Sequence, residues 1–218
     1  MHKWLLASFA ILLFCVSLSF GQPGSTAKPE DQPFLMAVDD TFYMNGIGTI
    51  AIGTVERGTI NNNDPVEIVG IHPTKTSTAK MVTEMGGPVA SAKAGDKINM
   101  ILKGIEKTDL ERGQVLAKPG SIQAVTKATI KFDLVSAADG GRRTPISDGY
   151  RPQVRARTGS FSATITLPTG KTSVAPGDKR VQAEVEFTDP APLEKGQTVS
   201  LLEGGRVVGT ATILALKQ

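Results

Sequence analysis

The residues with the clearest chemical potential are arginines gathered in one stretch of the second half of the chain. Five of them fall within sixteen residues, namely Arg142, Arg143, Arg151, Arg155 and Arg157. A guanidinium group presents a planar fork of N–H donors that matches the oxygens of a phosphate, so the cluster is a candidate contact for RNA or another polyanion. Arg155 and Arg157 alternate as residues on one face of a strand do. A solvated loop followed by an exposed strand face therefore stays open as the alternative interpretation.

Other patterns that could carry catalysis are incomplete. Residues 170–172 (GKT) are spelled like the end of a phosphate-binding loop, but Ile165 stands where such a loop needs a glycine. Asp39 and Asp40 could form an acid–base pair, yet adjacent residues of a strand point to opposite faces. His72 precedes a proline in a predicted turn. We therefore expect no enzyme activity, no metal site and no cofactor.

The composition indicates the kind of framework that must hold these residues. The chain has 218 residues, of which 40% are hydrophobic, and a formal net charge of +3. This length allows one or two small domains, and 23 glycines with 13 prolines favour many short strands joined by tight turns. The single Cys15 and the two histidines, His2 and His72, exclude a disulfide framework and a Cys/His zinc site.

Short alternating runs without helical periodicity predict an all-β fold. In the first half of the chain we expect strands over residues 34–38, 48–56, 64–71, 80–85 and 97–102. In the second half we expect strands over residues 126–135, 153–157, 160–167, 180–187, 198–202 and 206–214. Strands of this length and spacing are typical of barrels and sandwiches.

An internal repeat predicts two consecutive small β-barrels. Residues 94–97 (AGDK) followed by 110–114 (LERGQ) correspond to residues 176–179 (PGDK) followed by 193–197 (LEKGQ). The boundary falls at Lys118-Pro119-Gly120, so we expect one barrel over residues 34–118 and a second over residues 121–218.

The N-terminus has the pattern of a targeting sequence. A basic start precedes the apolar residues 4–16, a stretch too short to span a bilayer well. We expect a cleavable signal peptide over residues 1–21 with cleavage near Gly21-Gln22, followed by a flexible leader over residues 22–33. An uncleaved membrane anchor is the alternative.

Longer motifs resemble two domains of bacterial elongation factor Tu. Residues 53–58 (GTVERG), 66–71 (VEIVGI) and 110–120 (LERGQVLAKPG) resemble its second domain. Residues 140–145 (GGRRTP), 149–153 (GYRPQ) and 203–209 (EGGRVVG) resemble its third domain. The resemblance implies two barrels side by side. It does not extend to the family's GTPase domain, so we expect neither GTP binding nor GTP hydrolysis.

The resemblance also implies sites. Asp40 and Phe42 match the family's pocket for the aminoacyl end of tRNA, and Asp39 stands where the family has Glu. Four positions depart from that pocket, namely Ile52, Thr83, Gly86 and Lys97. Loss of their hydrogen-bonding groups argues against delivery of aminoacyl-tRNA. In the third domain, five residues match the tRNA-stem contact, with Arg143 in place of the usual His; the matching residues are Arg142, Thr144, Arg151, Arg157 and Thr158.

Two hypotheses for function follow from these observations. The first is an exported protein without a GTPase domain that acts as a non-catalytic binding or scaffold module for an unknown macromolecular partner. It predicts weak RNA or polyanion binding and no stable membrane insertion after cleavage. The alternative is a translation-related protein that binds tRNA or the ribosome through its barrels.

Overall fold

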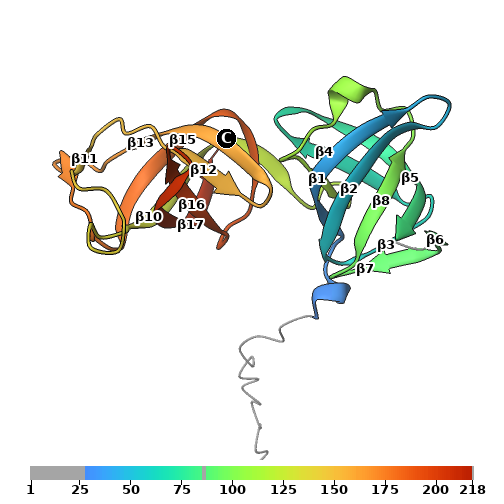
Figure 1. The fold of residues 1–218 in the computed structure, drawn as a ribbon, viewed down its shortest axis with the longest axis horizontal. Helices are drawn as coiled ribbons and strands as arrows, with labels where there is room; N and C mark the ends of the chain where they lie inside the picture. The colour runs from blue at the N-terminus through green and yellow to red at the C-terminus, as the bar shows by residue number, and fades with distance from the viewer. Residues whose placement is uncertain (1–27, 85–86, 218) are drawn as a thin grey trace, which may run out of the picture.

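The computed structural model describes residues 28–84 and 87–217 of the chain. These residues form two β-barrels that lie side by side (Figure 1), preceded by the short 3-10 helix η1 (Pro29–Asp31). The all-β fold predicted from the sequence is confirmed. The predicted signal peptide, residues 1–21, and the first part of the predicted leader lie outside the described residues. In the described ranges, no helix has the length and apolar character needed to cross a bilayer.

The first barrel is an antiparallel sheet in the order β4-β9-β1-β2-β8-β5-β6, closed because β5 also pairs with β4. Alternation along β8 shows how the core forms, since Ile98, Met100 and Leu102 are buried while Lys97 and Asn99 face outward. The strands are β1 (Leu35–Met44), β2 (Gly48–Arg57), β4 (Pro65–Gly70), β5 (His72–Glu84), β6 (Gly87–Val89), β8 (Lys97–Leu102) and β9 (Val115–Ala117), with β3 (Thr59–Asn61) paired to β7 (Ser91–Lys93) and η2 (Lys107–Asp109) in a loop.

The second barrel is closed in the order β10-β15-β13-β12-β16-β17. Its core follows the same alternation, and the rings of Phe161 and Phe187 meet edge to face with centroids 6.4 Å apart. The strands are β10 (Gln123–Leu134), β12 (Gln153–Ala156), β13 (Gly159–Thr166), β15 (Val181–Leu193), β16 (Thr198–Glu203) and β17 (Arg206–Lys217), with β11 (Ile146–Ser147) paired to β14 (Ser173–Val174).

The sequence repeat corresponds to two pairs of matching turns. Asp96 and Asp178 each accept a hydrogen bond from the backbone N–H three residues earlier, at 2.8 and 3.0 Å. Gln114 and Gln197 do the same with their side-chain oxygens, at 2.8 and 3.0 Å. Each barrel therefore uses the same side-chain hydrogen bonds to fix the turns before two of its strands.

The end of the predicted leader is attached to the first barrel. The carbonyl oxygen of Pro29 accepts a hydrogen bond from the N–H of Gly58 at 2.7 Å. The carbonyl oxygen of Pro33 accepts one from Nε of Arg57 at 3.1 Å. Two backbone carbonyls in the described part of the leader are thus hydrogen-bonded to the first barrel. The polar, proline-rich composition of the leader did not indicate these contacts.

The two barrels approach each other closely at a pair of glycines. A Cβ atom added to Gly113, whose φ is +102°, would lie 2.9 Å from the Cα of Gly159 on the second barrel. Next to this contact, Oγ1 of Thr158 donates a hydrogen bond to the carbonyl of Val38 at 2.7 Å, and the N–H of Ile71 donates one to Pro190 at 2.7 Å. The barrels share an interface in which their backbones touch.

Gly113→Ala should therefore destabilise the chain more than an equivalent change at a glycine away from the interface. Gly95 is the matched control, because its φ of +97° is similar and no atom lies within 4 Å of an added Cβ. Urea unfolding should give a loss of about 1 kcal/mol for Gly95→Ala from backbone strain alone. Gly113→Ala should lose a further ~1–3 kcal/mol from overpacking. Equal losses for the two variants would contradict the close contact.

Candidate functional site

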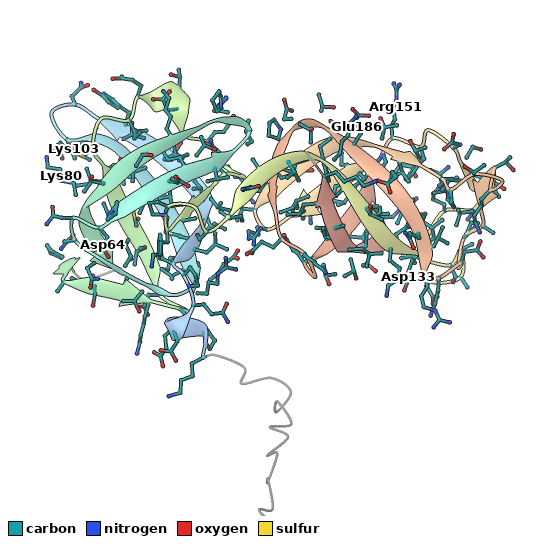
Figure 2. The ribbon with its side chains drawn as sticks, turned by 180° about the vertical axis from the view of Figure 1, so that it is seen from behind. Asp64, Lys80, Lys103, Asp133, Arg151 and Glu186 are labelled. Atoms are coloured by element: carbon teal, nitrogen blue, oxygen red, sulfur yellow. The ribbon has the colours of Figure 1, made fainter. Side chains whose placement is uncertain are left out.

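The arginines of the predicted cluster divide into two groups: some form ion pairs within the chain, and the others are exposed to solvent. Arg157 and Thr158 lie in the turn between β12 and β13, at the interface between the barrels. Arg143, Arg151 and Arg155 are exposed on the second barrel (Figure 2 labels Arg151). The sequence prediction that Arg155 and Arg157 share a strand face does not hold, because β12 ends at Ala156 and Arg157 has a φ of +52°.

Arg157 is the centre of an ion cluster between the barrels, which we call the interface ion cluster and which comprises Glu56, Arg57, Arg157 and Glu194. Nε of Arg157 contacts Oε2 of Glu56 at 2.9 Å, and Nη2 contacts Oε2 of Glu194 at 2.5 Å. Nη1 donates to the carbonyl of Pro192 at 2.7 Å. The side chain of Arg157 is only 9% exposed. Its guanidinium is thus committed to contacts within the chain and is not available for a polyanion.

Glu194 bridges two arginines from different barrels. Arg57, at the end of β2, holds its carboxylate with two hydrogen bonds of 2.8 and 2.7 Å, in addition to the contact from Arg157. Burial acts to raise the pKa of Glu194, but the hydrogen bonds and positive charges of Arg57 and Arg157 outweigh it and lower the pKa below its usual value. The bidentate geometry is the strong form of an arginine–carboxylate pair.

Thr158 and Arg142 are also engaged. Thr158 bonds Val38 through its hydroxyl, and its carbonyl accepts a hydrogen bond from Nε of Arg112 at 3.1 Å. Arg142 pairs with Glu203, bonds Thr144, and lies 5.2 Å above the Tyr150 ring. Burial and the Glu203 charge raise the pKa of the Tyr150 hydroxyl, so the ring stays neutral beneath the cation.

Arg151 and Arg155 lie on a surface that we call the polar outer face, which also comprises Gln153, Ser160, Ser162, Thr164, Thr188 and Ser200. Among the described residues, no ion pair or hydrogen bond engages the side chain of Arg151, of Arg155 or of Arg143, which is exposed in the loop before β11. Arg155 is paired across the sheet with Ser160 on one side and Ser200 on the other. Gln153 bonds both Ser162, at 2.9 Å, and Ser160, at 3.2 Å.

A depression of about 440 Å³ lies within the polar outer face. No acidic residue lines it; the lining residues are Arg151, Pro152, Gln153, Ser162, Ala163, Thr164 and Thr188. Glu186 stands on the neighbouring strand β15 and is paired with Lys127 at 3.3 Å. A free guanidinium beside hydroxyl and amide groups, without a carboxylate in the depression, can bind phosphate or sulfate oxygens.

The three residues of the predicted aminoacyl pocket lie on β1 in the first barrel. Asp39 is a β-bulge, because Val38 faces Gly53 while Asp40 faces the next residue, Ile52. The bulge interrupts the strict alternation that the sequence argument assumed. Asp40 accepts a hydrogen bond from the N–H of Thr41 at 2.8 Å, and Phe42 is 40% exposed. The pocket residues are thus open to solvent and lie on the other barrel from the polar outer face.

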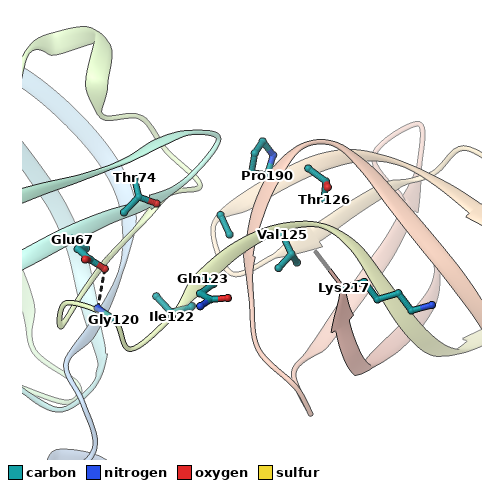
Figure 3. Close-up of a pocket in the computed structure, with 10 residues that line it drawn as sticks. Glu67, Thr74, Gly120, Ile122, Gln123, Val125, Thr126, Pro190 and Lys217 are labelled. Atoms are coloured by element: carbon teal, nitrogen blue, oxygen red, sulfur yellow. Dashed lines mark hydrogen bonds between the residues drawn. The ribbon is translucent and has the colours of Figure 1, made fainter.

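A second depression, of about 490 Å³, lies at the linker between the barrels (Figure 3). Both charged side chains that line it, Glu67 and Lys217, already have partners within the chain. Glu67 accepts a hydrogen bond from the N–H of Gly120 at 2.9 Å, and Lys217 pairs with Glu184 at 2.6 Å. These contacts fix the linker to the first barrel and the end of β17 to β15, and we assign no ligand there.

Sequence reasoning missed the interface ion cluster. Glu56 and Arg57 belong to the GTVERG motif, and Glu194 belongs to the second copy of the repeat, so both segments had been noticed. These residues meet only because the fold brings distant segments together; Arg57 and Glu194, for example, are 137 residues apart in the chain. Glu194 stands at the same place in its copy of the repeat as Glu111 does in the other copy, so the repeat did not indicate the partner of Glu194.

The structure defines a pair of joined small β-barrels with an ionic interface between them. Comparison with known families agrees with this fold. Residues 48–117 match the model of elongation factor Tu domain 2, and residues 121–217 match that of the elongation factor Tu C-terminal domain. The chain belongs to the elongation factor Tu family through these two domains, as the sequence motifs predicted, and is a translation-factor-like module.

The lowered pKa of Glu194 predicts a specific response to acid. Because the folded-state pKa lies below the usual value of 4.5, ionised Glu194 stabilises the folded chain above that pH, and this stabilisation is lost as the pH falls through the lowered pKa. Glu194→Gln should cost about 2 kcal/mol at pH 7 and flatten the acid dependence of the unfolding free energy.

Glu184→Gln is the control for this prediction. Glu184 also has a lowered pKa, mainly through its hydrogen bond from Lys217, but both side chains of that pair are about half exposed. Its loss should cost less than about 1 kcal/mol. If unfolding curves between pH 3 and pH 7, roughly the range over which carboxylates titrate, respond alike to the two variants, the proposed role of Glu194 is wrong.

Proposed function

We propose that this chain is a non-catalytic binding module that holds an anionic polymer on the polar outer face of its second barrel. The observation that carries the proposal is that Arg151 and Arg155 are exposed among hydroxyl and amide groups and have no partner among the residues that the structure describes. Guanidinium groups at strand spacing suit a chain of phosphate or sulfate groups, whose charges repeat along a backbone.

The nature of the remaining groups supports binding rather than catalysis. The arginine and carboxylate side chains of the interface ion cluster form hydrogen bonds with one another. The depression next to Arg151 is lined by hydroxyls, an amide and a guanidinium, which bind and orient anions but do not include a general base. We propose that the chain neither binds nor hydrolyses GTP.

We propose further that the module acts outside the cytoplasm. The support is the sequence of the first 21 residues, with a basic start, a short apolar stretch and small residues before Gln22. In that location the anionic partner is a cell-envelope or extracellular polymer.

A second candidate function is binding of tRNA or the ribosome. It is favoured by Arg142, Thr144 and the exposed Arg151, which match the family's tRNA-stem contact by resemblance, with Arg143 in place of the usual His. The exposed Asp40 and Phe42 on β1 also match the family's aminoacyl pocket by resemblance. The two functions differ in the polymer preferred and in the cellular compartment.

Replacing two arginines of the polar outer face should weaken polyanion binding and lower its salt dependence. Arg151→Gln with Arg155→Gln removes two cations whose side chains have no hydrogen-bond or ion-pair partner among the described residues, so the fold should be unaffected. We expect affinity for a sulfated polysaccharide and for a tRNA to fall about tenfold at low salt. The slope of log affinity against log salt concentration should decrease by about 1.5, as expected for two lost contacts.

Lys80→Gln with Lys103→Gln is the matched control, since both lysines are exposed on the first barrel (Figure 2) and the charge change is identical. This control should bind as the parent does. Equal loss in the two double variants would mean that net charge, not the polar outer face, governs binding. Preference for tRNA over the polysaccharide, with the chain retained in the cytosol at full-length mass, would favour the second candidate.

A further inference from the structure

Three turns within the described ranges place a glycine directly after an asparagine or an aspartate, namely at residues 45–46, 139–140 and 148–149. At such a pair the backbone nitrogen of the glycine can attack the carbonyl carbon of the preceding side chain and close a five-membered succinimide ring. Glycine permits the attack because it has no Cβ to shield its nitrogen. All three pairs are exposed, so the hydrogen bonds of the two reacting groups decide which pair can react.

The pair in the β1–β2 hairpin, Asn45 and Gly46, leaves both reacting groups unbonded. The turn is closed by the N–H of Ile47, which donates to the carbonyl of Met44 at 3.0 Å. In the part of the chain that the structure describes, no hydrogen bond engages the side chain of Asn45 or the N–H of Gly46. The Asn45 side chain can therefore turn toward the Gly46 nitrogen without losing a contact.

The pair Asp148 and Gly149 is held at both groups. Oδ1 of Asp148 accepts a hydrogen bond from the N–H of Leu167 at 2.8 Å, and the N–H of Gly149 donates to the carbonyl of Ile165 at 3.1 Å. Both bonds must break before the ring can close, so folding protects this pair.

The pair Asp139 and Gly140 is held in the same way. Oδ2 of Asp139 accepts a hydrogen bond from the hydroxyl of Ser136 at 2.7 Å, and the N–H of Gly140 donates to the carbonyl of Ala137 at 3.4 Å. The sequence thus offers three candidate pairs, and the structure leaves one of them free to react.

The other four asparagines are protected because no glycine follows them; they are Asn61, Asn62, Asn63 and Asn99. In the run of three, each N–H that would attack already donates to a backbone carbonyl, from Asn62 to Ala90, from Asn63 to Ala79 and from Asp64 to Asn61.

We propose that Asn45 is a site of spontaneous modification, at which its side-chain amide becomes a carboxylate. The Gly46 nitrogen gives its proton to solvent base and bonds to Cγ of Asn45, while the Cγ–Nδ2 bond breaks and Nδ2 leaves as ammonia. Water then opens the ring. Hydrolysis at Cγ gives aspartate, and hydrolysis at the main-chain carbonyl gives isoaspartate, whose chain continues through the side-chain carbon. Neither route needs an oxidant or a reductant.

The reaction changes the character of the hairpin. Residues 41–47 (TFYMNGI) carry no charged side chain at neutral pH, and the new carboxylate lowers the formal net charge of the chain from +3 to +2. Four exposed apolar side chains lie within three residues of it, namely Phe42, Tyr43, Met44 and Ile47. The tip of the hairpin is therefore uncharged in a newly made chain and anionic in an aged one.

Ageing of the folded and the unfolded chain tests the proposal. The chain is incubated in mildly alkaline buffer with and without guanidinium chloride and then digested. Peptide masses report deamidation, because a carboxylate in place of an amide adds about one dalton, and an isoaspartyl methyltransferase labels isoaspartate. Folding should leave the rate at Asn45 nearly unchanged. It should slow isoaspartate formation at Asp139 and Asp148 by about tenfold or more, since two hydrogen bonds must break.

Variants of the same turn provide a second test. Gly46→Ala shields the attacking nitrogen and should slow the reaction severalfold. Gly104→Ala is the matched control and should age as the parent does, because both glycines have similar φ values, +78° and +70°, with no atom within 4 Å of an added Cβ. Asn45→Gln should abolish the acidic form, since glutamine would have to close a six-membered ring.

Two results would overturn the proposal. One is an Asn45 that folding slows as strongly as it slows the two aspartates. The other is an acidic form that appears in Asn45→Gln at the yield of the parent chain.

Discussion

The arrangement of this molecule depends on one carboxylate, that of Glu194, which is shared by an arginine from each barrel. Arg57 and Arg157 reach it from opposite sides of the interface, and Arg157 also contacts Glu56. Two residues other than glycine, Ile71 and Arg157, adopt positive φ values at this interface, +59° and +52°. Such backbone is costly for a branched or long side chain, so the contacts across the interface must stabilise it.

The interface also separates structural arginines from arginines that can bind a ligand. Arg157 and Arg142 form ion pairs with carboxylates, whereas Arg151 and Arg155 form none with the part of the chain that the structure describes. The polar outer face and the β1–β2 hairpin lie on different barrels, which the ion cluster joins. The chain presents a cationic, hydroxylated surface on the second barrel and exposed apolar side chains in the β1–β2 hairpin of the first.

Much of the fold could be predicted from the sequence because alternation and turn residues are local signals. The long strands β2, β8, β13 and β16 were found nearly in full, while strands of two or three residues such as β9 and β14 carry too little alternation to detect. β5 begins at His72 rather than near Lys80, because its first half is rich in threonine and lysine and lacks an apolar face.

The site was less predictable, since the partners of Arg157 lie up to 101 residues away and its backbone leaves the strand. The most direct test of the account is the coupling free energy across the interface between Arg57 and Glu194, measured by a double-mutant cycle with Arg57→Gln and Glu194→Gln in urea unfolding. We predict a coupling of about 1–3 kcal/mol, as found for residues in one ion-pair network. A coupling near zero would show that the barrels are not held by this carboxylate and would contradict the account.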